Sequence, residues 1–112
     1  MTKTPSLDAT DKVGAEGATA PRITLDYMKS QIEKVYYKSA STGLETKGVC
    51  PSLDCMTMCY LVLKSGFVLV GKSTPMSPEN FDPEKGRTFA YEDALRSAWP
   101  LFAFHQLQAK VD

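Results

Sequence analysis

The residues that could do chemistry lie in the second half of the chain. Three consecutive donors follow an apolar run, and an arginine precedes a tyrosine by one helical turn, which places both on one helix flank. Such residues offer hydrogen bonds and charge to phosphates and flat rings to bases. If the ligand were a nucleotide, the candidate binding residues would be Lys72, Ser73, Thr74, Arg87, Tyr91 and Trp99.

Structural roles compete with this hypothesis at several positions. Core packing explains Tyr91 as well as ligand binding does, and a simple solvated role explains Arg87 equally well. For Trp99, packing is the favoured interpretation because a Trp-Pro pair at a helix end commonly packs. Tyr36 and Tyr37 could stack on a base, but a plain strand explains them equally well.

The sequence offers little that could catalyse a reaction. Catalysis needs a nucleophile beside a base, paired carboxylates or a metal, and His105 is the single histidine. Glu92 and Asp93 are adjacent on a predicted helix, so they point in different directions. No glycine-rich phosphate loop occurs. We therefore expect a binding protein without catalytic residues or a cofactor.

The three cysteines do not suggest a disulfide framework or a metal site. An odd count without a signal peptide argues against disulfides. The spacing of Cys50, Cys55 and Cys59 is not a common zinc spacing, although His105 could complete a Cys3His site. We expect Cys59 to be a small buried hydrophobe in a strand and the other two to lie in a loop.

The clearest elements are two strands, predicted over 57–64 and 67–74. Ser65 and Gly66 suit a two-residue hairpin turn between them. In this register the last residue of the first strand opposes the first residue of the second. One face then carries Cys59, Leu61, Leu63, Val68 and Val70, and the other carries Tyr60, Val62, Phe67 and Leu69.

A main C-terminal helix is predicted over about 83–98. Asp82 suits the N-cap and Pro83 the first helical position. Pro100 should end or kink the helix, and a second short helical segment is expected after it. Small side chains on one row would allow close approach to a sheet or to a second copy of the helix; they are Gly86, Ala90, Ala94 and Ala98.

The first half of the chain carries weaker signals. Residues 1–21 lack apolar periodicity and predict a flexible tail, leaving 22–112 as a single α+β domain. An N-terminal helix is predicted over about 24–34, with a short strand over 35–37 directly after it. Residues 39–55 read as a long loop.

Composition limits the classes of function. The 112 residues carry 13 basic and 13 acidic side chains, so the formal net charge is zero and nucleic-acid binding is disfavoured. No apolar run approaches the roughly 20 residues needed to cross a bilayer. The amino terminus shows no secretory signal, so we expect a cytoplasmic protein without membrane partners.

Both faces of the predicted hairpin are apolar. One main helix and one auxiliary helix can cover one face well, so the other face needs a second cover. The usual solution is a symmetric copy of the chain, giving a homo-oligomer such as a dimer or tetramer. In such an oligomer, clefts between copies would be natural ligand sites. The alternative is that the N-terminal helix covers the second face.

The second half of the chain also resembles a family of small accessory proteins from tailed phages, typified by N4 Gp49 and Sf6 gene 66. The resemblance covers about residues 56–105. Ser65 stands where the family more often has Asn, and the loop over 39–55 looks longer than usual. The matching motifs are Gly71-Lys72-Ser73, Phe81-Asp82, Gly86-Arg87, Ala90, Ala94 and Trp99-Pro100-Leu101.

The resemblance implies an accessory protein acting in the cytoplasm of an infected bacterium. Small phage proteins of this type include nucleotide sponges, which bind a cyclic oligonucleotide immune signal and withhold it from the host effector. We therefore expect an oligomeric anti-CBASS sponge that sequesters its ligand without cleaving it. The alternative is an inhibitor that occupies a host protein through the second apolar face.

Overall fold

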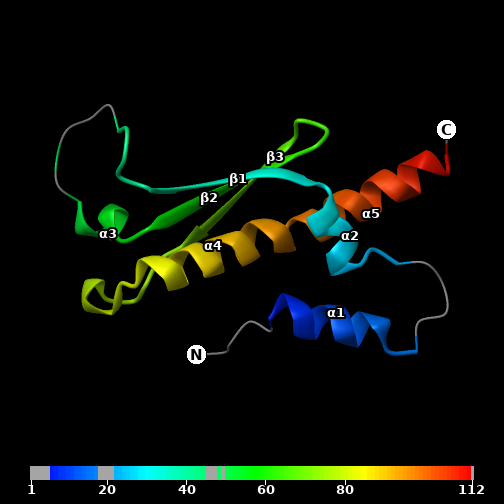
Figure 1. Ribbon diagram of the computed structural model, residues 1–112, viewed down its shortest axis with the longest axis horizontal. Helices are drawn as coiled ribbons and strands as arrows, with labels where there is room; N and C mark the ends of the chain where they lie inside the picture. Colours follow the sequence, from blue (N-terminus) through cyan, green and yellow to red (C-terminus); the bar gives the residue numbers. More distant parts are fainter. Residues whose placement is uncertain (1–5, 18–21, 45–47, 49, 112) are drawn as a thin grey trace.

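The structure is a computed structural model that describes residues 6–17, 22–44, 48 and 50–111. It confirms an α+β fold with an antiparallel sheet and a long C-terminal helix (Figure 1). The elements in chain order are α1 (Leu7–Ala15), α2 (Leu25–Ser30), β1 (Ile32–Ser39), α3 (Pro51–Asp54), β2 (Thr57–Leu63), β3 (Val68–Ser73), the 3-10 turn η1 (Pro78–Asn80), α4 (Pro83–Arg96) and α5 (Ala98–Ala109).

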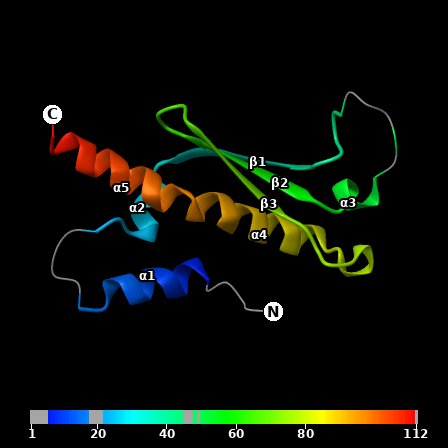
Figure 2. The same cartoon turned by 180° about the vertical axis from the view of Figure 1, so that it is seen from behind.

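The sheet has three antiparallel strands in the order β1-β2-β3, so β2 is central. Figures 1 and 2 show α4 running beneath the sheet, with α1 and α2 on that same side. The N-terminal helix therefore does not cover the second face of the sheet. We call that second face, turned away from α4, the open face.

The core lies between α4 and the central strand. Residues of β2 alternate between buried and half-buried along its length, as a strand with one covered face should. The buried members are Thr57, Cys59, Leu61 and Leu63. Leu25 and Met28 of α2 and Leu7 of α1 extend the same core past the end of the sheet.

Helix α4 approaches β3 closely because both surfaces are small at the contact. Ala90, Ala94 and Ala98 are fully buried. A Cβ atom on Gly71 would lie 2.5 Å from the backbone nitrogen of Ala94, and closer still to the carbonyl oxygen of Ala90. The row of small residues thus serves close packing on the sheet, one of the two uses that its spacing predicted.

The helix begins as its sequence predicts but ends earlier. The Asp82 carboxylate accepts hydrogen bonds from the backbone nitrogens of Glu84 and Lys85 at 3.0 and 3.3 Å, which satisfies two of the free donors of the first turn. Helix α4 ends at Arg96, two residues short of the predicted boundary. Pro100 falls in the first turn of α5, where its missing donor costs nothing.

The hairpin register differs from the prediction by one residue. The backbone nitrogen of Leu63 donates to the carbonyl oxygen of Phe67 at 2.9 Å, so three residues form the loop. Gly66 takes a left-handed φ of 94° there, as a three-residue hairpin loop requires. A one-residue slip exchanges the two faces of a strand. Leu69 therefore faces α4, whereas Val68 and Val70 lie on the open face.

The predicted N-terminal helix is too long. Thr24 caps α2 as expected, accepting from the nitrogen of Tyr27 at 3.0 Å, but α2 ends at Ser30. The chain then forms β1, an eight-residue strand that includes the predicted short strand. Its β-branched and aromatic residues pair with β2, and this tertiary pairing overrides the weak helical pattern over 24–34.

Two short helices lie in segments for which we expected no regular structure. Helix α1 falls within 1–21, and its Asp11 carboxylate accepts hydrogen bonds from Arg22 at 2.7 Å and from the Leu25 nitrogen at 3.2 Å. Helix α3 falls within 39–55. The remainder of these predictions on 1–5, 18–21, 45–47 and 49 lies outside the described residues.

We predict that Gly71→Ala destabilises the protein by about 3 kcal/mol or more, because the new methyl group collides with α4 backbone rather than with a flexible side chain. Chemical denaturation followed by circular dichroism measures this. Gly14→Ala is the matched control: it lies in α1, meets only an ordinary contact at 3.5 Å from Arg22, and should be neutral or slightly stabilising. Equal effects of the two substitutions would contradict the close contact.

Candidate ligand-binding site

A hollow of about 220 Å³ lies between β1 and the first turns of α4. We call it the β1–α4 hollow. It exists because α4 packs on β2 and β3 and leaves β1 only partly covered. Its lining residues are Tyr37, Lys38, Ser39, Thr57, Phe81, Pro83 and Arg87.

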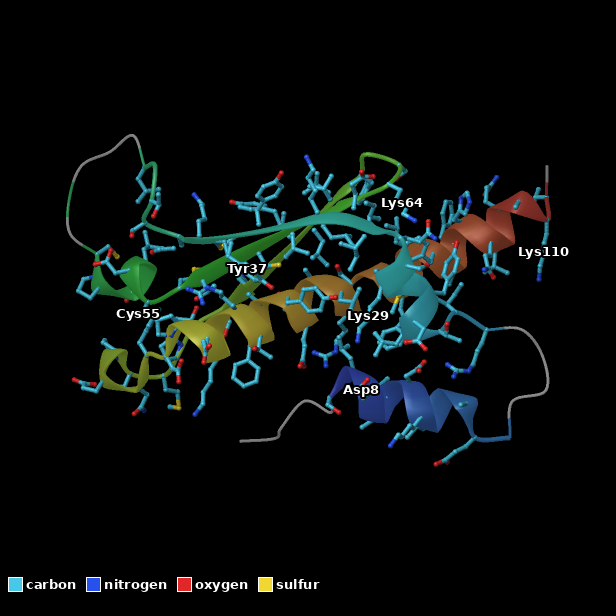
Figure 3. All side chains as sticks on the ribbon, viewed as in Figure 1. Asp8, Lys29, Tyr37, Cys55, Lys64 and Lys110 are labelled. Carbon is cyan, nitrogen blue, oxygen red and sulfur yellow. The ribbon has the colours of Figure 1, made fainter. Side chains whose placement is uncertain are left out.

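The hollow combines rings, donors and one free-standing cation. Tyr37 lies on the α4 side of β1 (Figure 3), and Phe81 approaches from the loop before α4. Arg87 is exposed on α4 and brings its guanidinium to the rim. Lys38 also borders the hollow, but it belongs to the open-face side of β1, and its ammonium group donates to the carbonyl oxygen of Thr42 at 2.9 Å. Among the described residues that line the hollow, none carries a carboxylate, although Asp82 stands between Phe81 and Pro83.

A row of hydroxyl groups crosses the sheet beneath the start of α4. Strand pairing places Ser39 opposite Thr57, and Thr57 opposite Ser73. All three face the helix, and Gly86 sits directly over Thr57, where a Cβ atom would lie 2.5 Å from the Thr57 Oγ1. The first turn of α4 lies above this row, and the Asp82 carboxylate already accepts from two of its free donors.

Beside the hollow, burial raises the pKa of three titratable groups, Cys59, Tyr37 and Tyr91. Burial raises the pKa of the Cys59 thiol to about 11, although a hydrogen bond from Tyr37 opposes the shift. Burial also raises the pKa of Tyr37, with Cys59 and Tyr91 adding to the effect and Arg87 opposing it. The pKa of Tyr91 rises chiefly through burial as well. At neutral pH the site thus offers uncharged phenols beside a single guanidinium.

The structure brings some of the predicted site residues together and separates others. Arg87 and Tyr91 lie on one flank of α4, near Tyr37. Tyr91 raises the pKa of Tyr37, and Arg87 lowers it. Ser73 and Thr74 line a second hollow of about 150 Å³ on the other side of α4. Phe81 lines both hollows, so the two lie next to each other.

The other two predicted site residues lie elsewhere. Trp99 packs against the core, and its indole nitrogen donates to the carbonyl oxygen of Ile23 at 3.0 Å. Lys72 points to the open face, while its backbone nitrogen donates to the Asp93 carboxylate at 2.9 Å. Neither lines the β1–α4 hollow.

Sequence reasoning missed Phe81, Ser39 and Thr57 as lining residues. Phe81 carried a usable signal, because it belongs to the Phe81-Asp82 motif directly before the helix cap. The two hydroxyl residues are joined only by strand pairing across the loop over 40–56, which no local pattern reveals.

The open face carries a mixed aromatic and basic surface. Tyr36, Tyr60 and Val70 form its central row across the three strands. Tyr36 and Val70 are about half exposed, at 52% and 51%. Lysines stand at the ends of the adjoining rows, at Lys34 on one side and at Lys38 and Lys72 on the other.

A larger groove of about 350 Å³ lies at the far end of the molecule, between α2, the hairpin loop and α5. Its walls are mainly apolar, with an edge-to-face contact between Tyr27 and Phe102 whose centroids are 5.5 Å apart. His105 and Lys64 are the titratable groups at its rim. This composition suits apolar side chains better than phosphates.

Comparison with known proteins gives a family assignment. The model of the Phage protein (N4 Gp49/phage Sf6 gene 66) family matches residues 23–111. The chain belongs to this family of phage proteins. The matched segment includes the sheet, α4 and α5, whereas α1 lies before it. No curated protein and no solved structure matches the chain.

No described helix has both the length and the apolar character to cross a membrane. Among the described residues, no three His, Cys, Asp or Glu side chains gather as a metal site would require. Cys59 is buried as predicted, and Cys50 and Cys55 flank α3 as free thiols.

We predict that stability falls as the pH rises from 9 towards 10, because the unfolded chain releases the Cys59 proton near 9.0 while the folded chain retains it to about 11. Thermal unfolding at closely spaced pH values measures the slope, to which the raised pKa values of Tyr37 and Tyr91 also contribute as the pH nears 10. Cys59→Ala should flatten the slope, and Cys50→Ala, which removes an exposed thiol, should leave it unchanged. An unaltered slope in Cys59→Ala would contradict the assignment.

Proposed function

We propose that this phage protein binds a cyclic oligonucleotide immune signal in the cytoplasm of the infected bacterium and withholds it without cleaving it. The observation that carries the proposal is the composition of the β1–α4 hollow. Tyr37 and Phe81 offer rings on which bases can stack, and Arg87 offers a charge-assisted donor to phosphates.

The same lining argues for binding rather than hydrolysis. Cleaving a phosphodiester requires a general base, a nucleophile or a metal. The hollow is lined by no His, Asp, Glu or Cys residue, and the phenols near it are neutral at physiological pH. A bound ligand would therefore meet groups that hold it and none that would activate water.

The shape of the chain supports an oligomer as the working form. The radius of gyration is 16.6 Å, against about 13 Å for a compact domain of this length. The molecule measures 52 × 32 × 19 Å. Apolar side chains stay exposed on the open face and on α5, where Phe104 and Leu107 lie on one helix flank. An elongated chain with these surfaces gains by association.

Calorimetry with a panel of cyclic di- and trinucleotides tests the proposal. We predict that at least one binds and that Arg87→Gln weakens its binding roughly 10- to 100-fold, since a charge-assisted hydrogen bond contributes about 1.5–3 kcal/mol. The ligand recovered after heat denaturation should be intact.

Lys29→Gln is the matched control, because it removes an exposed cation from α2, away from the hollow (Figure 3). It should bind as the unmodified protein does. A folded sample that binds none of the panel would defeat the proposal, and recovery of hydrolysis products would favour an enzyme instead.

The open face favours a second candidate function, inhibition of a host protein. A central row of Tyr36, Tyr60 and Val70 flanked by three lysines suits an acidic partner surface with an apolar centre. Aromatic residues of this kind often dominate protein interfaces.

This alternative predicts that a tagged protein captures one stoichiometric host protein and that Tyr36→Ala abolishes the capture. Arg87→Gln should retain the partner, because Arg87 lies on the opposite side of the sheet. Loss of the partner in Arg87→Gln with retention in Tyr36→Ala would exclude the open face as the docking surface.

A further inference from the structure

The two edges of the sheet are unlike. At the β3 edge, the outward backbone nitrogen of Lys72 donates to the Asp93 carboxylate of α4 at 2.9 Å. That contact occupies one of the outward donors of β3 and places the Asp93 side chain where a further strand would pair. At the β1 edge, no described element lies beyond the strand (Figures 1 and 2).

The pairing pattern shows which groups β1 presents outward. The backbone nitrogen of Ala40 donates to Met56 of the neighbouring strand at 2.8 Å. Because antiparallel residues alternate in direction, the even-numbered residues of β1 up to Ala40 bond to β2, and Val35, Tyr37 and Ser39 turn their backbone groups to the free edge. A row of unpaired donors and acceptors in a strand is a template for another strand.

The side of β1 that faces α4 also lacks a cover. Val35 and Tyr37 lie on that side but are 37% and 40% exposed, whereas their partners Leu61 and Cys59 on β2 are 0% exposed. The hollow beside Tyr37, at about 220 Å³, is smaller than the roughly 300–1,000 Å³ typical of ligand pockets. The exposed side chains of β1 and the small volume of the hollow both indicate a site that a second chain would complete.

We propose that two copies of the chain pair antiparallel along β1, so that their two β1–α4 hollows join into one site for a two-fold symmetric cyclic dinucleotide. This inference rests on the proposed function for its ligand and on the sheet edge for its geometry. The partner copy supplies a second Tyr37, Arg87 and Tyr91 to the site.

The positions of the lysines on β1 favour one register for pairing with β1 of the partner. Opposing Tyr37 to Tyr37 of the partner subunit matches the outward groups of Val35 to those of Ser39, with each pair exchanging hydrogen bonds. Lys38 then lies opposite a tyrosine, Tyr36, on the open face. The register one step away, centred on Tyr36, would set Lys34 against Lys38 and place like charges together, which destabilises a sheet.

The resulting site has the symmetry of its ligand. Strands are about 4.8 Å apart, so the two α4 helices, each centred between β2 and β3, would stand roughly 19 Å from one another. A helix with its side chains is about 10–12 Å across, which leaves a trough roughly 8 Å wide over the two tyrosines. A ring of two nucleotides presents each half of the trough with the same base and phosphate, whereas a ring of three cannot.

A matched pair of proline substitutions tests the pairing. Val35→Pro removes an outward donor at the β1 edge and no hydrogen bond within the chain. Val70→Pro does the same at the β3 edge, where the outward direction follows from the neighbouring Leu63–Phe67 and Lys72–Asp93 bonds. Sedimentation should show dimers for the unmodified protein and Val70→Pro, and monomers for Val35→Pro.

Calorimetry on the same proteins should show one cyclic di-adenylate or cyclic di-guanylate per two chains, and roughly tenfold or weaker binding by Val35→Pro. Ligand bound by a monomer, or one ligand per chain, would overturn the inference while sparing the proposed function. A dimer paired through β1 that binds no cyclic nucleotide would overturn the proposed function and the ligand assignment together.

Hydrogen exchange gives a readout that does not depend on any variant folding. In the dimer, the amides of Val35, Tyr37 and Ser39 should exchange slowly and lose protection on dilution, because they are exposed to water in a single chain. Fast exchange of these amides at a concentration where the protein is a dimer would place the interface elsewhere and overturn the pairing.

Discussion

The close contact between α4 and β3 at Gly71 is the constraint on which the rest of the molecule depends. Because a glycine faces alanines, the helix comes down onto the third strand and the middle strand, and its other flank stops short of the first. This offset creates the β1–α4 hollow and brings Asp93 to the β3 edge. A bulkier residue at Gly71 would move the helix, and with it both features.

The local signals in the sequence were sufficient for the fold class and for the main helix. Asp82 and Pro83 predict the start of α4 because one suits the N-cap and the other suits the first helical position. The alternation of side chains along β2 indicates a strand without any knowledge of its neighbours. The hairpin register was not accessible in this way. A Ser-Gly pair suits a two-residue turn, but the structure has a three-residue loop in which Gly66 takes a left-handed φ. The loop length sets the register, and the register decides which face of β3 is buried.

The candidate site likewise contains residues whose proximity follows from local sequence and others that only strand pairing brings together. Arg87 and Tyr91 are one helical turn apart, so their proximity follows from the sequence. Tyr37 joins them through pairing between strands separated by a long connection, and no local spacing encodes that. Trp99 shows the reverse case: a residue with plausible binding chemistry is held in place by the backbone of Ile23.

The Asp93 carboxylate on the Lys72 amide has a consequence for how far assembly can proceed. A sheet with two free margins can add chains indefinitely, which leads to filaments and insoluble protein. Here the Asp93 side chain obstructs the end of β3, which leaves β1 as the more open edge. Pairing of two chains through β1 would use up that edge, so strand addition would favour pairs over filaments.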